Sequence, residues 1–273
     1  MKKNKLAWIF TMAALGLVLF TLVNMRSDSK VNVILGGSKG AFIQSDSLTY
    51  VDPNAVEVTP EPTEDIWPDI DITMTQYTMV RDGSPLSVAW EPDCAKISGT
   101  NNQLFDVNAI SHLEDMLRDC REAGFTIYVT AAYRSYSYQN NLFNSKASQI
   151  AAGMGIDDYL DPRYQEAAEE AKKITMFPGT SEHQLGLAVD LMDKNYSRLV
   201  YENMDQEMFA WLDAHCAEYG FIKRYPTRKL LLTGWDEPWH YRYVGVEAAT
   251  FIMEHGICYE EFYAHYDPSF RYG

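Results

Sequence analysis

The stretch that decides the fold covers residues 179–193 and reads GTSEHQLGLAVDLMD. Apolar side chains alternate with others in the LAVDL of residues 187–191, which predicts a short strand with one apolar face. Asp190 lies on the opposite face of that strand. His183 comes seven residues earlier, and Gly186 between them allows a turn. The pattern therefore predicts a loop histidine beside a strand carboxylate.

Asp190 has two interpretations at this point. A carboxylate in the middle of an apolar strand is costly unless it is paired with a cation or binds a metal ion. The first interpretation is a salt bridge from Asp190 to an arginine elsewhere in the fold. The second is a metal site that Asp190 shares with His183 and with a ligand from another part of the chain.

A second motif reads EPWH over residues 237–240 and stands at the start of another predicted strand. Two imidazoles and one carboxylate, from His183, His240 and Asp190, give Zn²⁺ three protein ligands and leave one position for water. Zinc lowers the pKa of such a water to about 7, so hydroxide is available near neutral pH. A carboxylate that does not bind the metal must then take the water proton and pass it to the leaving amine. Glu237 is the candidate for this general base.

A third motif, AYRSY at residues 132–136, ends a predicted strand, and Gln139 follows near a helix start. An arginine at a strand end can project into a cleft. There Arg134 would bind a carboxylate with two hydrogen bonds or stabilise the oxyanion of a tetrahedral intermediate. The alternative is a structural arginine that pairs with a nearby acid such as Asp119 or Glu122.

Three segments occur in this order along the chain: AAYRSYSYQ at 131–139, GTSEHQLGLAVDL at 179–191 and EPWHYRYVG at 237–245. Together they resemble the VanY family of zinc D-alanyl-D-alanine carboxypeptidases. The resemblance extends roughly from Met79 to Gly256. It implies a small α+β peptidase fold with one zinc ion.

The resemblance also implies a role for each polar residue of the three motifs. Glu237 matches the catalytic base of the family. Arg134 matches the residue that stabilises the reacting carbonyl or the substrate carboxylate. Gln139 and Ser181 match positions that line the substrate site. The zinc ligands that the resemblance implies are His183, Asp190 and His240.

The remaining pattern predicts helices around a few strands in mixed order, and hence one α+β domain over residues 77–273. Its sheet is expected to be short, mixed or antiparallel, and flanked by helices. A hairpin is expected at Asp82-Gly83. The LLLTGWD of residues 230–236 is more apolar than the resemblance leads us to expect, so at this loop the resemblance leaves substrate specificity open more than it does the chemistry. Helices are expected at 109–123, 137–152, 162–174, 206–219 and 246–254, and strands at 125–133, 187–191 and 239–244.

Residues 6–25, LAWIFTMAALGLVLFTLVNM, are the one stretch long and apolar enough to span a bilayer as a helix. This stretch is longer than the hydrophobic part of most signal peptides, and no small-residue cleavage site or nearby cysteine follows it. We therefore expect an uncleaved signal anchor rather than a cleaved signal peptide. Three lysines in residues 1–5 place that tail in the cytoplasm and the rest of the chain outside the membrane.

Residues 26–76 are expected to form an extracytoplasmic acidic stem. Between residues 27 and 76 there are nine acidic and two basic residues, a net charge of −7. The segment VTPEPTEDIWPDID contains three prolines and has no helical or strand period. Acidic segments with proline repel themselves and stay extended. We expect the stem to act as a spacer from the membrane.

The whole chain of 273 residues has a formal charge of −15. This charge argues against nucleic acid as a partner, because phosphate binding needs clustered lysine and arginine. With 47% hydrophobic and 22% charged residues, the composition excludes disorder of the whole chain. The four cysteines permit disulfides outside the membrane, and buried free thiols are equally compatible with the sequence.

These features together predict a membrane-anchored carboxypeptidase with one Zn²⁺ per chain on the outer face of the cell membrane. Its partners would be the membrane and peptidoglycan stem peptides, from which it would remove the C-terminal D-alanine. The same fold could instead act as an L,D-carboxypeptidase on tetrapeptide stems or as an endopeptidase. The ligand set would also suit a non-catalytic zinc-containing wall-binding module, or a non-haem iron oxygenase in which Glu237 would have no role.

Overall fold

The computed structural model describes residues 67–196 and 198–272, which belong to a unit of the chain from Thr63 to Gly273. The expected cytoplasmic tail, the expected signal anchor and the stem up to residue 66 lie outside the described residues. Within the described ranges, no helix is both long enough and apolar enough to cross a membrane.

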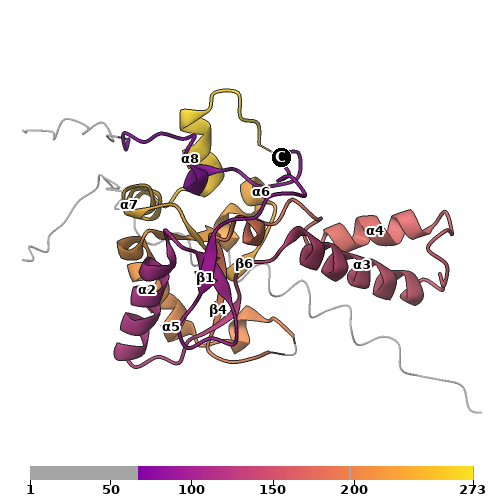
Figure 1. Ribbon diagram of the computed structural model, residues 1–273, viewed down its shortest axis with the longest axis horizontal. Coiled ribbons are helices and arrows are strands. Elements are labelled where there is room, and N and C mark those ends of the chain that lie inside the picture. The colour runs from indigo at the N-terminus through magenta and orange to yellow at the C-terminus, as the bar shows by residue number, and fades with distance from the viewer. Residues whose placement is uncertain (1–66, 197, 273) are drawn as a thin grey trace, which may run out of the picture. The chain divides into compact units, whose positions relative to one another are not determined.

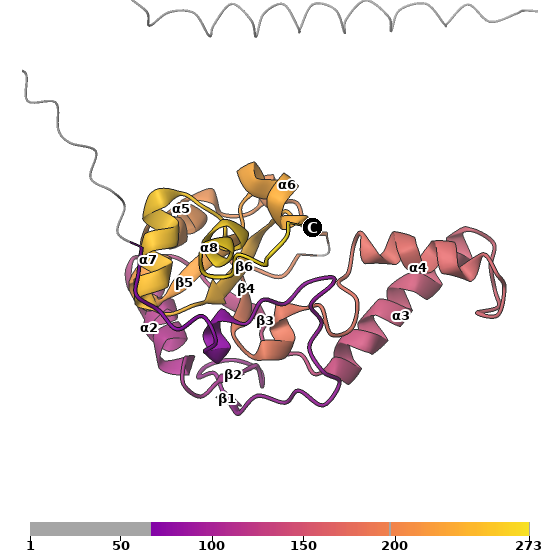
Figure 2. The ribbon, with the colours of Figure 1, turned by 90° about the horizontal axis from the view of Figure 1, so that it is seen from above.

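The strands are β1 (Cys94–Lys96), β2 (Leu104–Asp106), β3 (Tyr128–Ala131), β4 (Ala188–Met192), β5 (Phe221–Tyr225) and β6 (Glu237–Tyr243). A four-stranded sheet with the order β3-β4-β6-β5 forms the centre of the fold (Figures 1 and 2). All its neighbouring strands are antiparallel, and β1 and β2 form a separate antiparallel pair. The expected α+β class with a short antiparallel sheet is confirmed.

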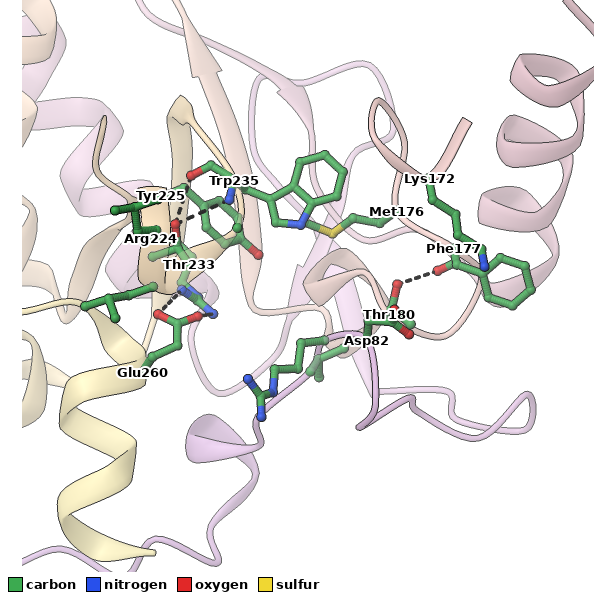
Figure 3. Close-up of a pocket in the computed structure, with 15 residues that line it drawn as sticks. Asp82, Lys172, Met176, Phe177, Thr180, Arg224, Tyr225, Thr233, Trp235 and Glu260 are labelled. Atoms are coloured by element: carbon green, nitrogen blue, oxygen red, sulfur yellow. Dashed lines mark hydrogen bonds and ion pairs between the residues drawn. The ribbon is translucent and has the colours of Figure 1, made fainter. Parts of the chain in front are cut away.

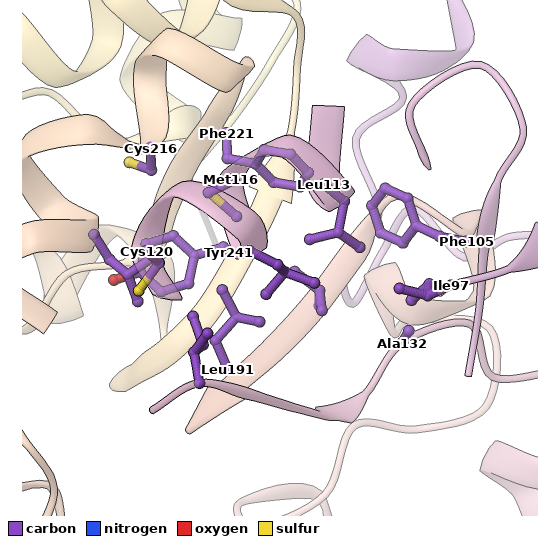
Figure 4. Packing of buried hydrophobic residues seen from close by; sticks show 14 of the residues in the cluster. Ile97, Phe105, Leu113, Met116, Cys120, Ala132, Leu191, Cys216, Phe221 and Tyr241 are labelled. Atoms are coloured by element: carbon purple, nitrogen blue, oxygen red, sulfur yellow. The ribbon is translucent and has the colours of Figure 1, made fainter. Parts of the chain in front are cut away.

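One face of the central sheet holds the main hydrophobic core. Helices α2 (Ile110–Glu122) and α5 (Gln206–His215) contribute buried side chains to this core. Val189 and Leu191 of β4 and Tyr241 of β6 are fully buried in it. Figure 4 shows side chains of α2 next to those of the sheet. The alternation expected for residues 187–191 therefore places its apolar side chains in the core.

A second hydrophobic cluster lies beneath α7 (Val246–His255) and α8 (Tyr259–Tyr266). Ile222 of β5 belongs to this cluster and lies opposite Arg242 of β6, on the face that does not carry Tyr241. This second face of the sheet therefore combines an apolar region with the polar side chains of the metal site described below.

Helices α3 (Tyr136–Gly153) and α4 (Tyr164–Lys172) lie side by side as an arm that extends away from the sheet (Figures 1 and 2). Ser135 caps α3, because its hydroxyl accepts a hydrogen bond from the backbone N–H of Tyr138 at 3.2 Å. The cap makes the helix begin at Tyr136, the last residue of the third motif.

Most expected elements are present with shifted bounds. The expected strand 125–133 is shorter at both ends. At its C-terminal end, the backbone N–H of Ala132 donates to the side chain of Gln103 instead of to a neighbouring strand. The expected helix 206–219 ends earlier and continues as a 3₁₀ turn, Cys216–Tyr219.

Several further elements differ from the expectation. The hairpin expected at Asp82-Gly83 is a single bridge between Arg81 and Ser84. Helix α4 begins at Tyr164, two residues after Pro162. The elements that sequence patterns did not predict are β1, β2, β5, the short helix α6 (Leu230–Thr233) and α8.

The packed part of the chain begins earlier than the boundary expected at residue 76. Trp67 stacks on His265 of α8, with ring centroids 3.8 Å apart. The carbonyl of Gln76 accepts a hydrogen bond from the buried guanidinium of Arg242 at 3.0 Å. Residues 67–76 thus pack with the folded domain, and the expected description of them as a spacer is wrong.

The four cysteines form no disulfide among the described residues. Cys120 and Cys216 are completely buried in the main core. Burial raises the pKa of the Cys216 thiol to about 12. Free thiols, rather than disulfides, are therefore the correct interpretation of the cysteines.

We predict that a chain starting at residue 77 is less stable than one starting at residue 63. The shorter chain loses the stacking of Trp67. It also loses the carbonyl of Gln76, one of the two carbonyls, with that of Thr78, that accept hydrogen bonds from one terminal nitrogen of Arg242. Losses of this kind cost about 1–3 kcal/mol. Thermal unfolding of both chains, and of Trp67→Ala in the longer one, measures the effect. Equal melting temperatures would show that the segment does not stabilise the domain.

Candidate metal centre

The register of β4 and β6 sets two of the expected ligands beside each other. Asp190 in β4 lies directly opposite His240 in β6. Side chains paired in this way on one face have Cβ atoms about 4.5–5.5 Å apart. Nδ1 of His240 is 3.0 Å from Oδ1 of Asp190, and both residues are buried.

His183 reaches the same point from the 3₁₀ turn η2 (Glu182–Leu185). Gly186 ends this turn with a φ of 78°, and a Cβ atom there would come within 2.9 Å of a neighbouring sulfur atom, so glycine is required. Nδ1 of His183 donates to the carbonyl oxygen of Ala132 at 2.7 Å. Nε2 is then left with its lone pair, 3.3 Å from Oδ2 of Asp190.

The three expected ligands form a cluster that fits a metal ion. Ligand atoms of His183, Asp190 and His240 all lie within 4.8 Å of one another. Zinc bonds to imidazole nitrogen and carboxylate oxygen are about 2 Å long, so one ion can contact all three atoms after small side-chain movements. The same donor set also suits non-haem iron.

Charges around the cluster give the two histidines different protonation states. Burial and the positive charge of Arg134 lower the pKa of His183 to about 4. Burial also opposes the charged form of His240, but the neighbouring carboxylates of Asp190 and Glu182 outweigh it and raise the His240 pKa to about 9. Without a metal, His183 is therefore neutral at pH 7 and His240 carries a second proton.

Glu237 begins β6 and lies at the edge of the cluster. Its Oε2 atom is 4.0 Å from Nδ1 of His240, and its side chain is 24% exposed, more than that of any of the three ligands. Burial raises the pKa of Glu237 to about 7. A carboxyl group with this pKa can both accept and return a proton near neutral pH.

Arg134 donates hydrogen bonds to two of the expected ligands. Its backbone N–H donates to the carbonyl of His183, and its guanidinium donates to Oδ2 of Asp190, each at 3.1 Å. The alternative pairing with Asp119 or Glu122 is therefore wrong. The salt bridge from Asp190 to an arginine is present, and it coexists with the two histidine contacts.

Gln139 and Ser181 lie in the wall of the same pocket, each with 1% of its surface exposed. Nε2 of Gln139 donates to the carbonyl of Met176 at 2.8 Å. Oε1 of Gln139 and Oγ of Ser181 have no hydrogen-bond partner among the described residues. Buried polar atoms usually have partners, so both atoms are suited to contact a ligand. All seven residues expected at the site line this one pocket, and their individual roles stay predictions.

Met176 also lines a second pocket, whose lining residues Figure 3 shows. Leu231 and Trp235, from the apolar stretch 230–236, form part of its wall, and Leu231 is 95% exposed. Tyr225 also lines this second pocket, and its ring lies 5.0 Å from the ring of His240. The stretch for which the resemblance leaves specificity open therefore lines a pocket that shares a wall residue with the pocket of the metal cluster.

Glu182 is a residue of the site that sequence reasoning missed, although it stands between Ser181 and His183 in the first motif. Its side chain is completely buried, and Oε1 accepts a hydrogen bond from Nε of Arg224 at 2.8 Å. Oε2 lies 3.5 Å from Nε2 of His240. The signal available in the sequence was that Glu182, a charged residue, stands between two residues that were assigned to the site.

The family model that matches this chain is VanY, D-alanyl-D-alanine carboxypeptidase, over residues 102–246. The chain belongs to the VanY family. The D-alanyl-D-alanine carboxypeptidase of Enterococcus faecalis is 34% identical over 185 residues, which make up 67% of this chain and 64% of that protein. The chain thus spans slightly less than two thirds of that relative.

Two solved structures are similar to this VanY family member. One is a mutant of the vancomycin resistance D,D-pentapeptidase VanY from a VanB-type cassette, in complex with Zn(II). It has a TM-score of 0.57 and 32% identity, and the match covers 69% of this chain and 99% of that chain. The other, the LD-carboxypeptidase LdcB, has a TM-score of 0.57 and 27% identity, with 69% and 85% covered.

We predict that zinc binds this VanY site more tightly as pH rises. His240, with a pKa of about 9, must lose a proton to bind metal, whereas His183, with a pKa of about 4, is already neutral. Between about pH 5.5 and pH 6.5 the association constant should rise about tenfold. Competition with a chelator measures it, best in Glu237→Gln, which removes the group that titrates near pH 7. An affinity independent of pH would contradict the assignment of His240 as a ligand.

Proposed function

We propose that this protein is a zinc-dependent D,D-carboxypeptidase that removes the C-terminal D-alanine from peptidoglycan stem peptides. The observation that carries this proposal is one pocket in which the cluster of His183, Asp190 and His240 lies with Glu237 and Arg134. The match to the VanY family and the activity named for the Enterococcus faecalis relative support the substrate.

We propose one Zn²⁺ per chain, held by Nε2 of His183, Nδ1 of His240 and the carboxylate of Asp190. The geometry of the cluster and the VanY structure with Zn(II) support this assignment. Zinc supplies a Lewis acid that polarises the scissile carbonyl and lowers the pKa of water. In a non-haem iron oxygenase with the same ligands, Glu237 would have no role as a general base.

Glu237 acts first as general base and then as general acid. Its carboxylate takes a proton from the attacking water and returns it to the amine of the departing D-alanine. Its pKa, which burial raises to about 7, suits both transfers near neutral pH. Its greater exposure, compared with the three ligands, lets it meet the substrate.

Arg134 places positive charge beside the reacting carbonyl. Its contact with Asp190 puts the guanidinium next to the metal ligands, where negative charge develops on the carbonyl oxygen. The hydroxyl of Ser181 has no protein partner among the described residues and can donate to the terminal carboxylate. Oε1 of Gln139 can accept an N–H of the substrate.

We further propose that residues 6–25 anchor the protein in the cell membrane, with the catalytic domain on the outer face. The apolar length of this segment and the lysines that precede it support this orientation. The pocket would then face the cell wall, where its substrate would lie.

Mass spectrometry of pentapeptide and tetrapeptide stems incubated with the zinc-loaded full chain tests the proposal. Loss of the terminal D-alanine from the pentapeptide supports D,D-carboxypeptidase activity, and C-terminal amidation of that peptide should prevent it. Cleavage of the tetrapeptide alone would identify an L,D-carboxypeptidase, which the similarity to LdcB favours as the second candidate. Cleavage of amidated peptide would identify an endopeptidase, and no cleavage at all would favour a wall-binding module.

We predict that Glu237→Gln keeps its zinc but loses activity. The variant preserves the size of the side chain and leaves all three ligands in place, but it cannot accept the water proton. Loss of a general base lowers kcat by about 10²–10⁴-fold. Metal analysis and steady-state kinetics measure both effects, with His240→Ala as the control that should lose zinc. Near-normal turnover in Glu237→Gln would remove Glu237 from the mechanism.

Arg134→Lys separates the two roles proposed for this arginine. We expect kcat to fall by about 10²–10³-fold, because one aimed donor to the oxyanion is lost. A rise in KM at unchanged kcat would instead assign Arg134 to the terminal carboxylate, for which a lysine offers a point charge in place of a fork. Kinetics over a range of peptide concentrations distinguish the outcomes.

A further inference from the structure

We propose that Glu182 is a positioning residue for His240. Its carboxylate accepts the Nε2 proton of His240 and so directs Nδ1 of that ring to the metal. This inference rests on the metal site proposed above and adds a residue that does not touch metal or substrate.

Glu182 is adjacent to the ligand His183, yet its side chain contacts the other histidine ligand. Oε2 of Glu182 is 3.5 Å from Nε2 of His240. The side chains of Glu182 and His240 are 0% and 1% exposed. Neither of these two atoms has another hydrogen-bond partner among the described residues. A small movement of either side chain completes a hydrogen bond between them.

The position of the proton on His240 decides whether this ring can bind metal. A neutral imidazole carries one proton, and only the nitrogen without it offers a lone pair. Nδ1 of His240 faces Asp190 at 3.0 Å, inside the ligand cluster. An acceptor at Nε2 keeps the proton there and frees Nδ1. Partners of this kind commonly fix the tautomer and orientation of metal-binding histidines.

Glu182 is itself held by two buried arginines. Oε1 is 2.8 Å from Nε of Arg224 and 3.2 Å from a terminal nitrogen of Arg242. Both cations approach the same oxygen, which leaves Oε2 for His240. Arg224 also binds Glu260 with two hydrogen bonds, of 2.7 and 3.0 Å (Figure 3). Two carboxylates and two guanidiniums thus balance one another inside the protein.

Glu260 provides a matched control for Glu182. Both are buried carboxylates that neutralise Arg224. Glu182 also lies beside Arg242, so the two carboxylates are compared with Arg242 replaced in both variants. Of the two, Glu182 is the one that reaches His240. In Glu182→Gln the amide oxygen would face the two arginines, because they can only donate. The amide NH₂ would then face Nε2 of His240 and favour the tautomer with its proton on Nδ1.

The test compares the double variants E182Q/R242Q and E260Q/R242Q in the full chain. Each removes one carboxylate and one guanidinium, so the buried charges stay balanced in both. Competition with a chelator measures zinc affinity, and thermal unfolding of the metal-free proteins measures stability. We expect zinc to bind E182Q/R242Q about 10–100-fold more weakly than E260Q/R242Q. Equal affinities would overturn the role of Glu182.

A second measurement needs no substitution. In the zinc-bound wild-type chain, ¹⁵N NMR of the histidines should show a proton on Nε2 of His240 and the metal on Nδ1. The reverse arrangement would overturn the proposal even if a variant failed to fold. A wild-type chain that binds no zinc would instead refute the metal site itself. Wild-type zinc binding with equal affinities in the two variants would refute only the role of Glu182.

Discussion

The pairing of β4 with β6 is the constraint on which the site depends. In this register Asp190 meets His240 on one face, and Tyr241 fills the main core on the other. A slip of one residue would exchange the two faces of β6, so that His240 would enter the apolar core. The hydrophobic packing of one face therefore fixes the positions of the metal ligands on the other face.

The ligand cluster was predictable because its residues stand in short motifs with a chemical meaning. Helix α2 was predictable from the spacing of its apolar residues, and its observed bounds differ little from the expected ones. The strand β5 was missed because its sequence, FIKRY, places two cations where an alternating pattern should continue. Arg224 is nevertheless buried, since Glu182 and Glu260 neutralise it from distant parts of the chain. No local pattern contains those partners.

The start of the domain was missed for a related reason. Composition gives only the average polarity of a segment. The acids and prolines in and around residues 67–76 make that average polar, although the segment also holds apolar side chains. Packing depends on single side chains: Trp67, Ile70 and Ile72 each contact the second hydrophobic cluster. Arg242 connects the same segment to the buried charges, since it binds the carbonyl of Gln76 and lies beside Glu182.

The arm formed by α3 and α4 has a base that lines the pocket and a tip that does not, so its two ends tolerate sequence change differently. Its base supplies Gln139, Leu142 and Ile174 to the pocket wall, whereas the residues at its tip, 157–160, are all exposed. The tip extends away from the sheet (Figures 1 and 2). Longer or shorter loops cost little at such a place. Insertions should therefore accumulate at the tip during evolution, and a reporter fused there would leave the wall of the pocket unchanged.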